Sequence, residues 1–115
     1  MNVYDQAHTL CRALKESEEY RDYMRLKEVA YEDATNKALL DEYKRLQFRL
    51  QAKMASGEAL PDDDMQRLTQ IGTLLQLNKD VGDYLVAEFR YQRLLADVFK
   101  ILSEVSGIDP EMFAR

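Results

Sequence analysis

Few side chains in this chain are of the types that carry out chemistry. His8 is the only histidine and Cys11 is the only cysteine. A di-iron bundle needs paired Glu-x-x-His motifs and a zinc site needs several cysteines or histidines, so neither centre can be built here. We expect His8 to be a structural or surface residue. We expect Cys11 to be a buried, inert thiol, because no second histidine accompanies it as an activating base.

The carboxylates give equally little sign of catalysis. The run Asp62–Asp64 resembles half of a calcium loop, but the glycine and the terminal glutamate of an EF-hand loop are missing. It fits better in the first turn of a helix, where the helix dipole favours negative charge. Glu88 lies in an apolar seam between Tyr84 and Tyr91, where we expect it to be hydrogen-bonded to an Arg or Tyr. The sequence therefore predicts no catalytic, cofactor-binding or metal-binding residue and no enzyme.

One run of basic residues is the only candidate for nucleic-acid contact. The segment "KRLQFRLQAK" places Lys44, Arg45, Arg49 and Lys53 near Phe48. Domains that bind nucleic acid are usually basic, whereas this chain has a net charge of −5. We favour an ordinary charged helix face, and direct contact with RNA is the alternative.

Helices must position these residues. The 115-residue chain is 46% hydrophobic and 32% charged, and it contains only four glycines and two prolines. Sheets need frequent turns, so this composition predicts an all-α, core-forming protein. Apolar residues spaced three and four apart predict helices over 3–16, 18–32, 34–55 and 79–106, with another after the loop "SGEALPDDD", whose Pro61 suits the first helical turn. Ser17, Asp33 and Asn78 are the predicted helix caps, and Asp33 marks either a break or a kink.

Two of the predicted helices are long. At 1.5 Å per residue, residues 34–55 span roughly 33 Å and residues 79–106 roughly 42 Å. A compact chain of this size has a radius of gyration near 13 Å. We therefore predict an elongated antiparallel bundle or hairpin of four to five helices. It would form a single domain over residues 1–115, with a loose tail from about 107.

The last predicted helix carries more apolar surface than an ordinary surface helix needs. Large apolar residues cover roughly 240° of its circumference, against about 100° for a helix with one buried face. We expect its bulkiest seam to face the chain's own core: Tyr84, Tyr91, Leu95, Val98 and Leu102. A second chain would cover the neighbouring seam: Leu85, Phe89, Ala96 and Phe99. This interpretation favours a dimer or larger oligomer, although helices 3–16 and 18–32 could instead fold back and cover everything in a monomer.

Phe48 marks a second candidate contact surface. It lies nearly opposite the apolar stripe of its helix, among Ala34, Ala38, Ala52 and Ala55. Small residues let another helix approach closely, and an aromatic ring can anchor it. We expect Phe48 to contact a partner rather than the core.

Three segments together resemble the YlbF/YmcA family of small bacterial helical proteins, and its YheA-like branch most of all. They are "ALKESEEYRDYMRLKE", "LLDEYKRLQFRLQAKMASGEAL" and "YLVAEFRYQRLLADVFKIL". The markers within them are the run Ser17–Tyr20, the turn at Gly57, and Tyr84 with Glu88.

The resemblance implies an all-α cytoplasmic protein that self-associates or pairs with relatives. Better-studied members influence competence, biofilm formation and sporulation in Gram-positive bacteria, through a complex that affects messenger-RNA processing by an endoribonuclease. Some relatives bind an iron–sulfur cluster through cysteines, but Cys11 alone cannot hold one, so no cofactor is expected. The N-terminus lacks the basic start and apolar run of a signal peptide, and no segment approaches the ~18 apolar residues of a membrane span. Both features agree with a cytoplasmic location.

Overall fold

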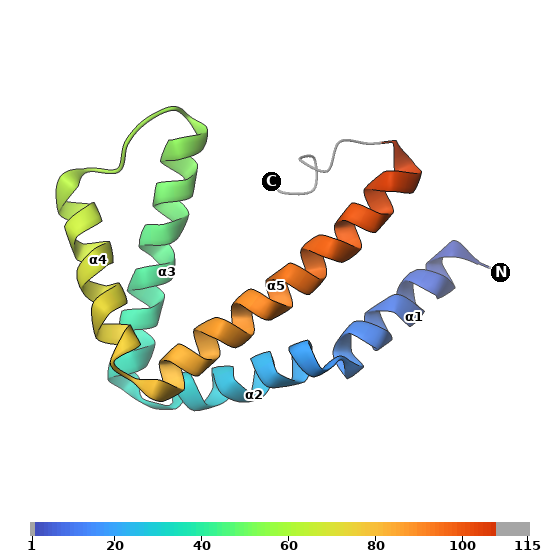
Figure 1. Ribbon diagram of the computed structural model, residues 1–115, viewed down its shortest axis with the longest axis horizontal. Helices are drawn as coiled ribbons and strands as arrows, with labels where there is room; N and C mark the ends of the chain where they lie inside the picture. The colour runs from blue at the N-terminus through green and yellow to red at the C-terminus, as the bar shows by residue number, and fades with distance from the viewer. Residues whose placement is uncertain (1, 108–115) are drawn as a thin grey trace. The chain divides into compact units, whose positions relative to one another are not determined.

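A computed structural model describes residues 2–107 as five α-helices, without a strand in that range (Figure 1). The helices are α1 (Val3–Glu16), α2 (Glu18–Glu32), α3 (Ala34–Ala55), α4 (Asp62–Gln76) and α5 (Lys79–Ser106). The prediction of an all-α protein with four to five helices, two of them long, is confirmed. Asp33 separates two helices. Beyond Gly107, the predicted loose tail lies outside the residues that the structure describes.

Polar side chains begin the helices where the sequence predicts them. The Ser17 hydroxyl accepts a hydrogen bond from the backbone N–H of Tyr20 at 3.2 Å and donates one to the carbonyl of Leu14 at 2.6 Å. It therefore ends α1 and begins α2. Asp33 and Asn78 each accept the backbone N–H three residues further on, at 3.0 and 3.2 Å. These bonds satisfy amide groups that the first turn of a helix leaves without partners.

Glycine ends two of the helices. Gly57 follows α3 with a φ of +76°, and Gly107 follows α5 with a φ of +69°. Side chains disfavour this left-handed conformation, so glycine is the residue that stops a helix there at least cost. The run Asp62–Asp64 occupies the first turn of α4, as predicted.

Backbone contacts divide the chain into two compact units, and the first is Arg25–Tyr84. In this unit α3 and α4 pack side by side as an antiparallel hairpin (Figure 1). Tyr84 is fully buried, lies edge-on to Tyr31 with ring centroids 5.6 Å apart, and its hydroxyl accepts a hydrogen bond from Lys44. The remaining core is aliphatic: Ala30, Leu40, Leu46, Leu60, Ile71, Leu75 and Val81. Of the described residues that are buried and apolar, all but Ala87 therefore lie in this unit.

The second unit combines residues 1–24 with residues 85–115. Among its residues whose burial is described, 2–24, 85–105 and 107, only Ala87 is buried. It contains α1, the start of α2 and most of α5, and it exposes apolar side chains along both long helical segments. The single-domain expectation for residues 1–115 stays a prediction.

Candidate interaction surfaces

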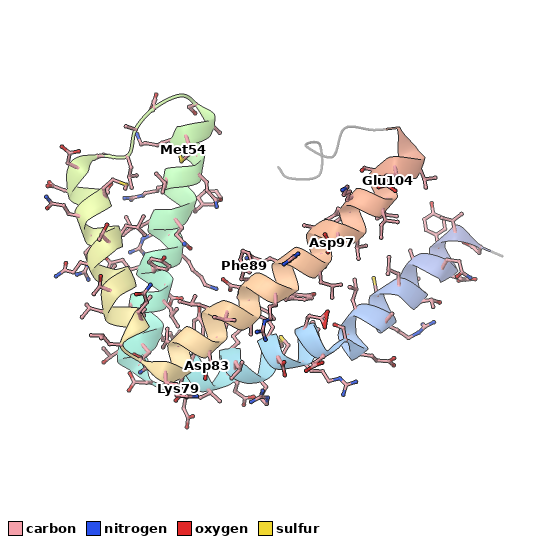
Figure 2. All side chains as sticks on the ribbon, in the orientation of Figure 1. Met54, Lys79, Asp83, Phe89, Asp97 and Glu104 are labelled. Atoms are coloured by element: carbon pink, nitrogen blue, oxygen red, sulfur yellow. The ribbon has the colours of Figure 1, made fainter. Side chains whose placement is uncertain are left out.

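The seam of α5 predicted to meet another chain is accessible. Phe89 is 65% exposed and Phe99 is 46% exposed, while Ala96 is exposed and Leu85 is half-buried. Figure 2 shows where Phe89 lies along α5. Two large aromatic rings on one helix are costly to leave in water, because each contributes about 1.5–3 kcal/mol when fully buried. The assignment of these four residues to a contact stays a prediction.

The seam expected to face the chain's own core is at least half-buried as far as Val98 and exposed beyond it. Tyr84 is buried, and Tyr91 and Leu95 are half-buried. Leu102 is exposed, and Val105, which continues the seam, is 87% exposed. The prediction is therefore wrong for the C-terminal end of α5. Spacing shows which side chains share a face, but it does not show where the covering helix ends.

Helix α1 presents an apolar stripe that is mostly exposed, with only Leu14 half-buried. None of its residues is buried, and Val3 and Leu10 of the stripe are exposed. Cys11 beside the stripe is exposed as well, so the expectation of a buried thiol is wrong. The reason is the same, because a cysteine beside an apolar stripe is buried only if that stripe is covered. His8 is a surface residue, in agreement with the prediction.

Three tyrosines pack the start of α2 against α5. The ring of Tyr91 stacks on Tyr23 with centroids 5.2 Å apart, and it meets Tyr20 edge-on at 5.5 Å. Burial raises the pKa of the Tyr91 hydroxyl, and the neighbouring Tyr20 adds to the effect. Aromatic pairs of this kind contribute about 0.5–1.5 kcal/mol beyond the area they bury. The cluster fixes the spacing of the two helices at this point.

A charged groove of about 380 Å³ lies between these same segments of α2 and α5. Asp97 marks its position on α5 in Figure 2. Four carboxylates, two guanidinium groups and two apolar side chains line it: Glu18, Glu19, Asp22, Asp97, Arg90, Arg93, Ala87 and Leu94. Neither histidine nor cysteine is among them. Such a groove can form ion pairs with a bound segment that carries charges of both signs.

Sequence reasoning did not find this groove, although both walls carry a signal. The charges of the last helix, including Arg90, Arg93 and Asp97, crowd one side of it. Glu18 and Glu19 belong to the family marker that begins at Ser17. The sequence does not show that the tyrosine cluster brings together two segments about 70 residues apart.

The second predicted surface, around Phe48 on α3, is also accessible. The ring is 73% exposed, and the alanines Ala38 and Ala52 beside it are exposed. Leu46 on the opposite side of the helix is buried in the core of its unit. Phe48 therefore lies outside the core, and its role in partner contact stays a prediction.

Most of the basic run on α3 is engaged with other side chains. Lys44 donates to the Tyr84 hydroxyl at 2.5 Å. Arg49 lies 3.6 Å from Asp64, and Lys53 lies 3.4 Å from a glutamate in the following loop. Intramolecular partners reduce the positive charge that this face can offer to a phosphate backbone.

A grouped set of metal ligands and a bilayer-crossing helix were both sought in the part of the chain that the structure describes. Within residues 2–107, no three His, Cys, Asp or Glu side chains are grouped so that they could hold a metal ion. None of the helices described there combines the length and apolar character that a bilayer crossing requires.

The sequence matches a family model over nearly its whole length. A model described as "Control of competence regulator ComK, YlbF/YmcA" matches residues 3–106. A UPF0342 protein from Caldicellulosiruptor saccharolyticus is 35% identical over 112 residues, which cover 97% of this chain and 93% of the relative. A UPF0342 protein from Symbiobacterium thermophilum is 38% identical over 108 residues, covering 93% of this chain and 96% of the relative.

Two solved structures share the fold. A protein of unknown function (DUF964) from Bacillus stearothermophilus superposes with a TM-score of 0.73, over 89% of this chain and 90% of that one. Bacillus subtilis RicA, crystallised in complex with RicF, gives a TM-score of 0.59 over 91% of this chain and 94% of the other. Both are 22% identical to this chain, so the likeness is one of fold.

Proposed function

Because the chain belongs to the YlbF/YmcA family, whose model describes control of the competence regulator ComK, we propose that it is a non-enzymatic regulatory or scaffolding protein. It acts in the cytoplasm through helix-mediated self-association and through protein partners. Its role resembles that of the relatives that regulate competence, biofilm formation and messenger-RNA processing in Gram-positive bacteria.

The observation that carries the proposal is the exposed apolar surface of α5. Contiguous apolar surface on a protein marks a site of contact with another molecule. Helix α1 adds exposed apolar surface of its own, because none of its residues is fully buried. The relative RicA was crystallised in complex with RicF, which supports a role for protein partners in this chain too.

The two accessible surfaces suggest two kinds of contact. We assign self-association to the α5 seam formed by Leu85, Phe89, Ala96 and Phe99. We assign a different protein partner to the surface around Phe48, because its flanking alanines would let a foreign helix approach closely.

A pull-down with matched variants tests the function. Tagged wild-type protein is recovered from its native host with and without nuclease treatment, beside Phe48→Glu and the charge-matched control Gln47→Glu, whose position is also exposed. We expect wild type and control to recover RNA-processing proteins or a second family member, and Phe48→Glu to lose them. Recovery that is identical for all three, or that depends on RNA, contradicts the proposed contact.

The alternative function, direct RNA contact by an accessory factor, has its own test. The net charge of −5 and the engaged basic run both weigh against it. We expect purified protein to show no tight RNA binding at physiological salt in fluorescence anisotropy. Sub-micromolar affinity that falls steeply with salt would replace our proposal with the RNA-binding one.

A further inference from the structure

Helix α3 differs in charge from the rest of the chain. It carries five lysines and arginines against two aspartates and glutamates, which gives it a net charge of +3. The other four described helices are neutral or negative, and the whole chain has a net charge of −5. Positive charge is therefore concentrated on one helix of an acidic protein, and the same helix exposes the ring of Phe48.

Two of the five basic side chains of α3 are available to a partner. The other three are engaged with Tyr84, Asp64 and Glu58, as described above. Lys37 and Arg45 are exposed, and neither forms an ion pair or a side-chain hydrogen bond within residues 2–107. At about 100° per residue, both lie within about 60° of Phe48 around the helix.

The face that carries these cations combines an aromatic anchor with small residues. Phe48 is 73% exposed, and Ala52 and Ala55 are exposed one and two turns further along α3. Small side chains let another helix approach the backbone, and the ring can pack against its apolar residues. Lys37 and Arg45 lie at the other end of this face. The face therefore fits an amphipathic helix that is apolar opposite Phe48 and acidic opposite the two cations.

A carboxylate within this face favours a protein over a nucleic acid. Asp41 is exposed about one turn from both Lys37 and Arg45. A phosphate backbone carries negative charge only, so Asp41 would repel it and only the two cations would hold it. A protein helix carries charges of both signs, so it can place carboxylates opposite Lys37 and Arg45 and a basic residue opposite Asp41.

We propose that the surface around Phe48 binds an amphipathic helix of another protein, which is acidic where it faces Lys37 and Arg45. The inference rests on the proposed function and names the chemistry of the partner at this surface. Lys37 and Arg45 are about 12 Å apart along the helix axis, because each residue of a helix rises about 1.5 Å. Two carboxylates about eight residues apart on the partner helix match this spacing.

Photo-cross-linking in the native host identifies the segment that lies on this surface. Phe48 is replaced by p-benzoyl-phenylalanine, which keeps an aromatic ring at the position. After irradiation of living cells, the cross-linked peptide is sequenced by mass spectrometry. We expect a segment of a different protein that has more Asp and Glu than Lys and Arg, with two carboxylates about eight residues apart. A neutral or basic segment, a second copy of this chain, or RNA at this position overturns the proposal.

Charge reversal tests whether the two cations contribute to the contact. Lys37→Glu with Arg45→Glu, in the cross-linking background, should lower the cross-link yield about tenfold, because two attractive pairs become repulsive. Arg12→Glu with Lys15→Glu is the matched control, because it changes the net charge equally at exposed positions of the other compact unit. The control should keep the full yield, and circular dichroism should show equal helicity for both double variants.

The outcomes separate this inference from the proposed function. A cross-link to another protein whose yield is the same in both double variants overturns the acidic partner, while contact at Phe48 stands. The absence of any cross-link to another protein overturns the contact at Phe48 and the acidic partner together. Lys37→Gln with Arg45→Gln repeats the test without adding negative charge, and we expect a smaller loss of yield in the same direction. An unchanged yield in this variant also contradicts the proposal.

Discussion

Replacing both phenylalanines of the seam should abolish self-association without unfolding the helices. Full burial of a phenylalanine contributes about 1.5–3 kcal/mol. Phe89 and Phe99 are 65% and 46% exposed, so a corresponding part of this burial free energy is still available to an interface. Scaling by these fractions and counting two copies gives about 3–7 kcal/mol of association free energy. A micromolar dimer is held by about 8 kcal/mol, so Phe89→Asp with Phe99→Asp should be monomeric at about 100 µM.

Light scattering and circular dichroism on the same samples provide the assay. Ile101→Asp is the matched control, because Ile101 is 61% exposed but lies on the other side of α5, about 160° from the seam. We expect the control to remain oligomeric and the double variant to be monomeric and helical. A double variant that still associates like the wild type refutes the role of the seam. Loss of helicity would show instead that the two rings stabilise the fold.

Three further predictions concern other parts of the chain. Phe48→Glu should leave the thermal unfolding midpoint within a few degrees of that of Gln47→Glu, because the ring is 73% exposed and contributes little to the core. Asp33→Ala should lower the free energy of unfolding in urea by about 1 kcal/mol, whereas Asp33→Asn should largely preserve it, because the side chain caps α3. Arg67 donates two hydrogen bonds to Glu42 and so lowers the pKa of Glu42 below 4.5. The ionised form is thus favoured in the folded state, and the stabilisation is present above pH 4.5 and lost as pH falls through the folded-state pKa. Unfolding midpoints should fall less steeply with acid in Arg67→Gln, and an unchanged acid dependence would contradict the pairing.

Helix boundaries could be predicted from the sequence because local chemistry determines them. Ser17, Asp33 and Asn78 are short polar side chains that can accept an amide N–H of a first turn, and all three do so. Gly57 and Gly107, which each follow a helix, adopt the left-handed conformation that glycine allows. These features depend on a few neighbouring residues only.

Coverage of the helices could not be predicted in the same way. Leu40 is fully buried, whereas Met54, which lies on the apolar stripe of the same helix, is 66% exposed. Cys11 and Val105 belong to apolar faces and are exposed. The charged groove depends on the contact between Tyr20 and Tyr91, which lie far apart in the sequence. In each case the spacing of apolar residues defines one face of a helix, but tertiary packing determines whether another helix covers that face.

The junction at Ser17 has a consequence for local opening of the chain. A single residue ends α1 and begins α2, and α1 buries none of its side chains. The amide protons of α1 should therefore exchange with solvent through fraying at little free-energy cost, while those near Leu40 and Ile71 await opening of the core. A partner that covers the stripe of α1 would slow exchange there and leave the core unchanged. Hydrogen exchange of the α1 amides, followed by mass spectrometry, would therefore show whether a partner is bound to this helix.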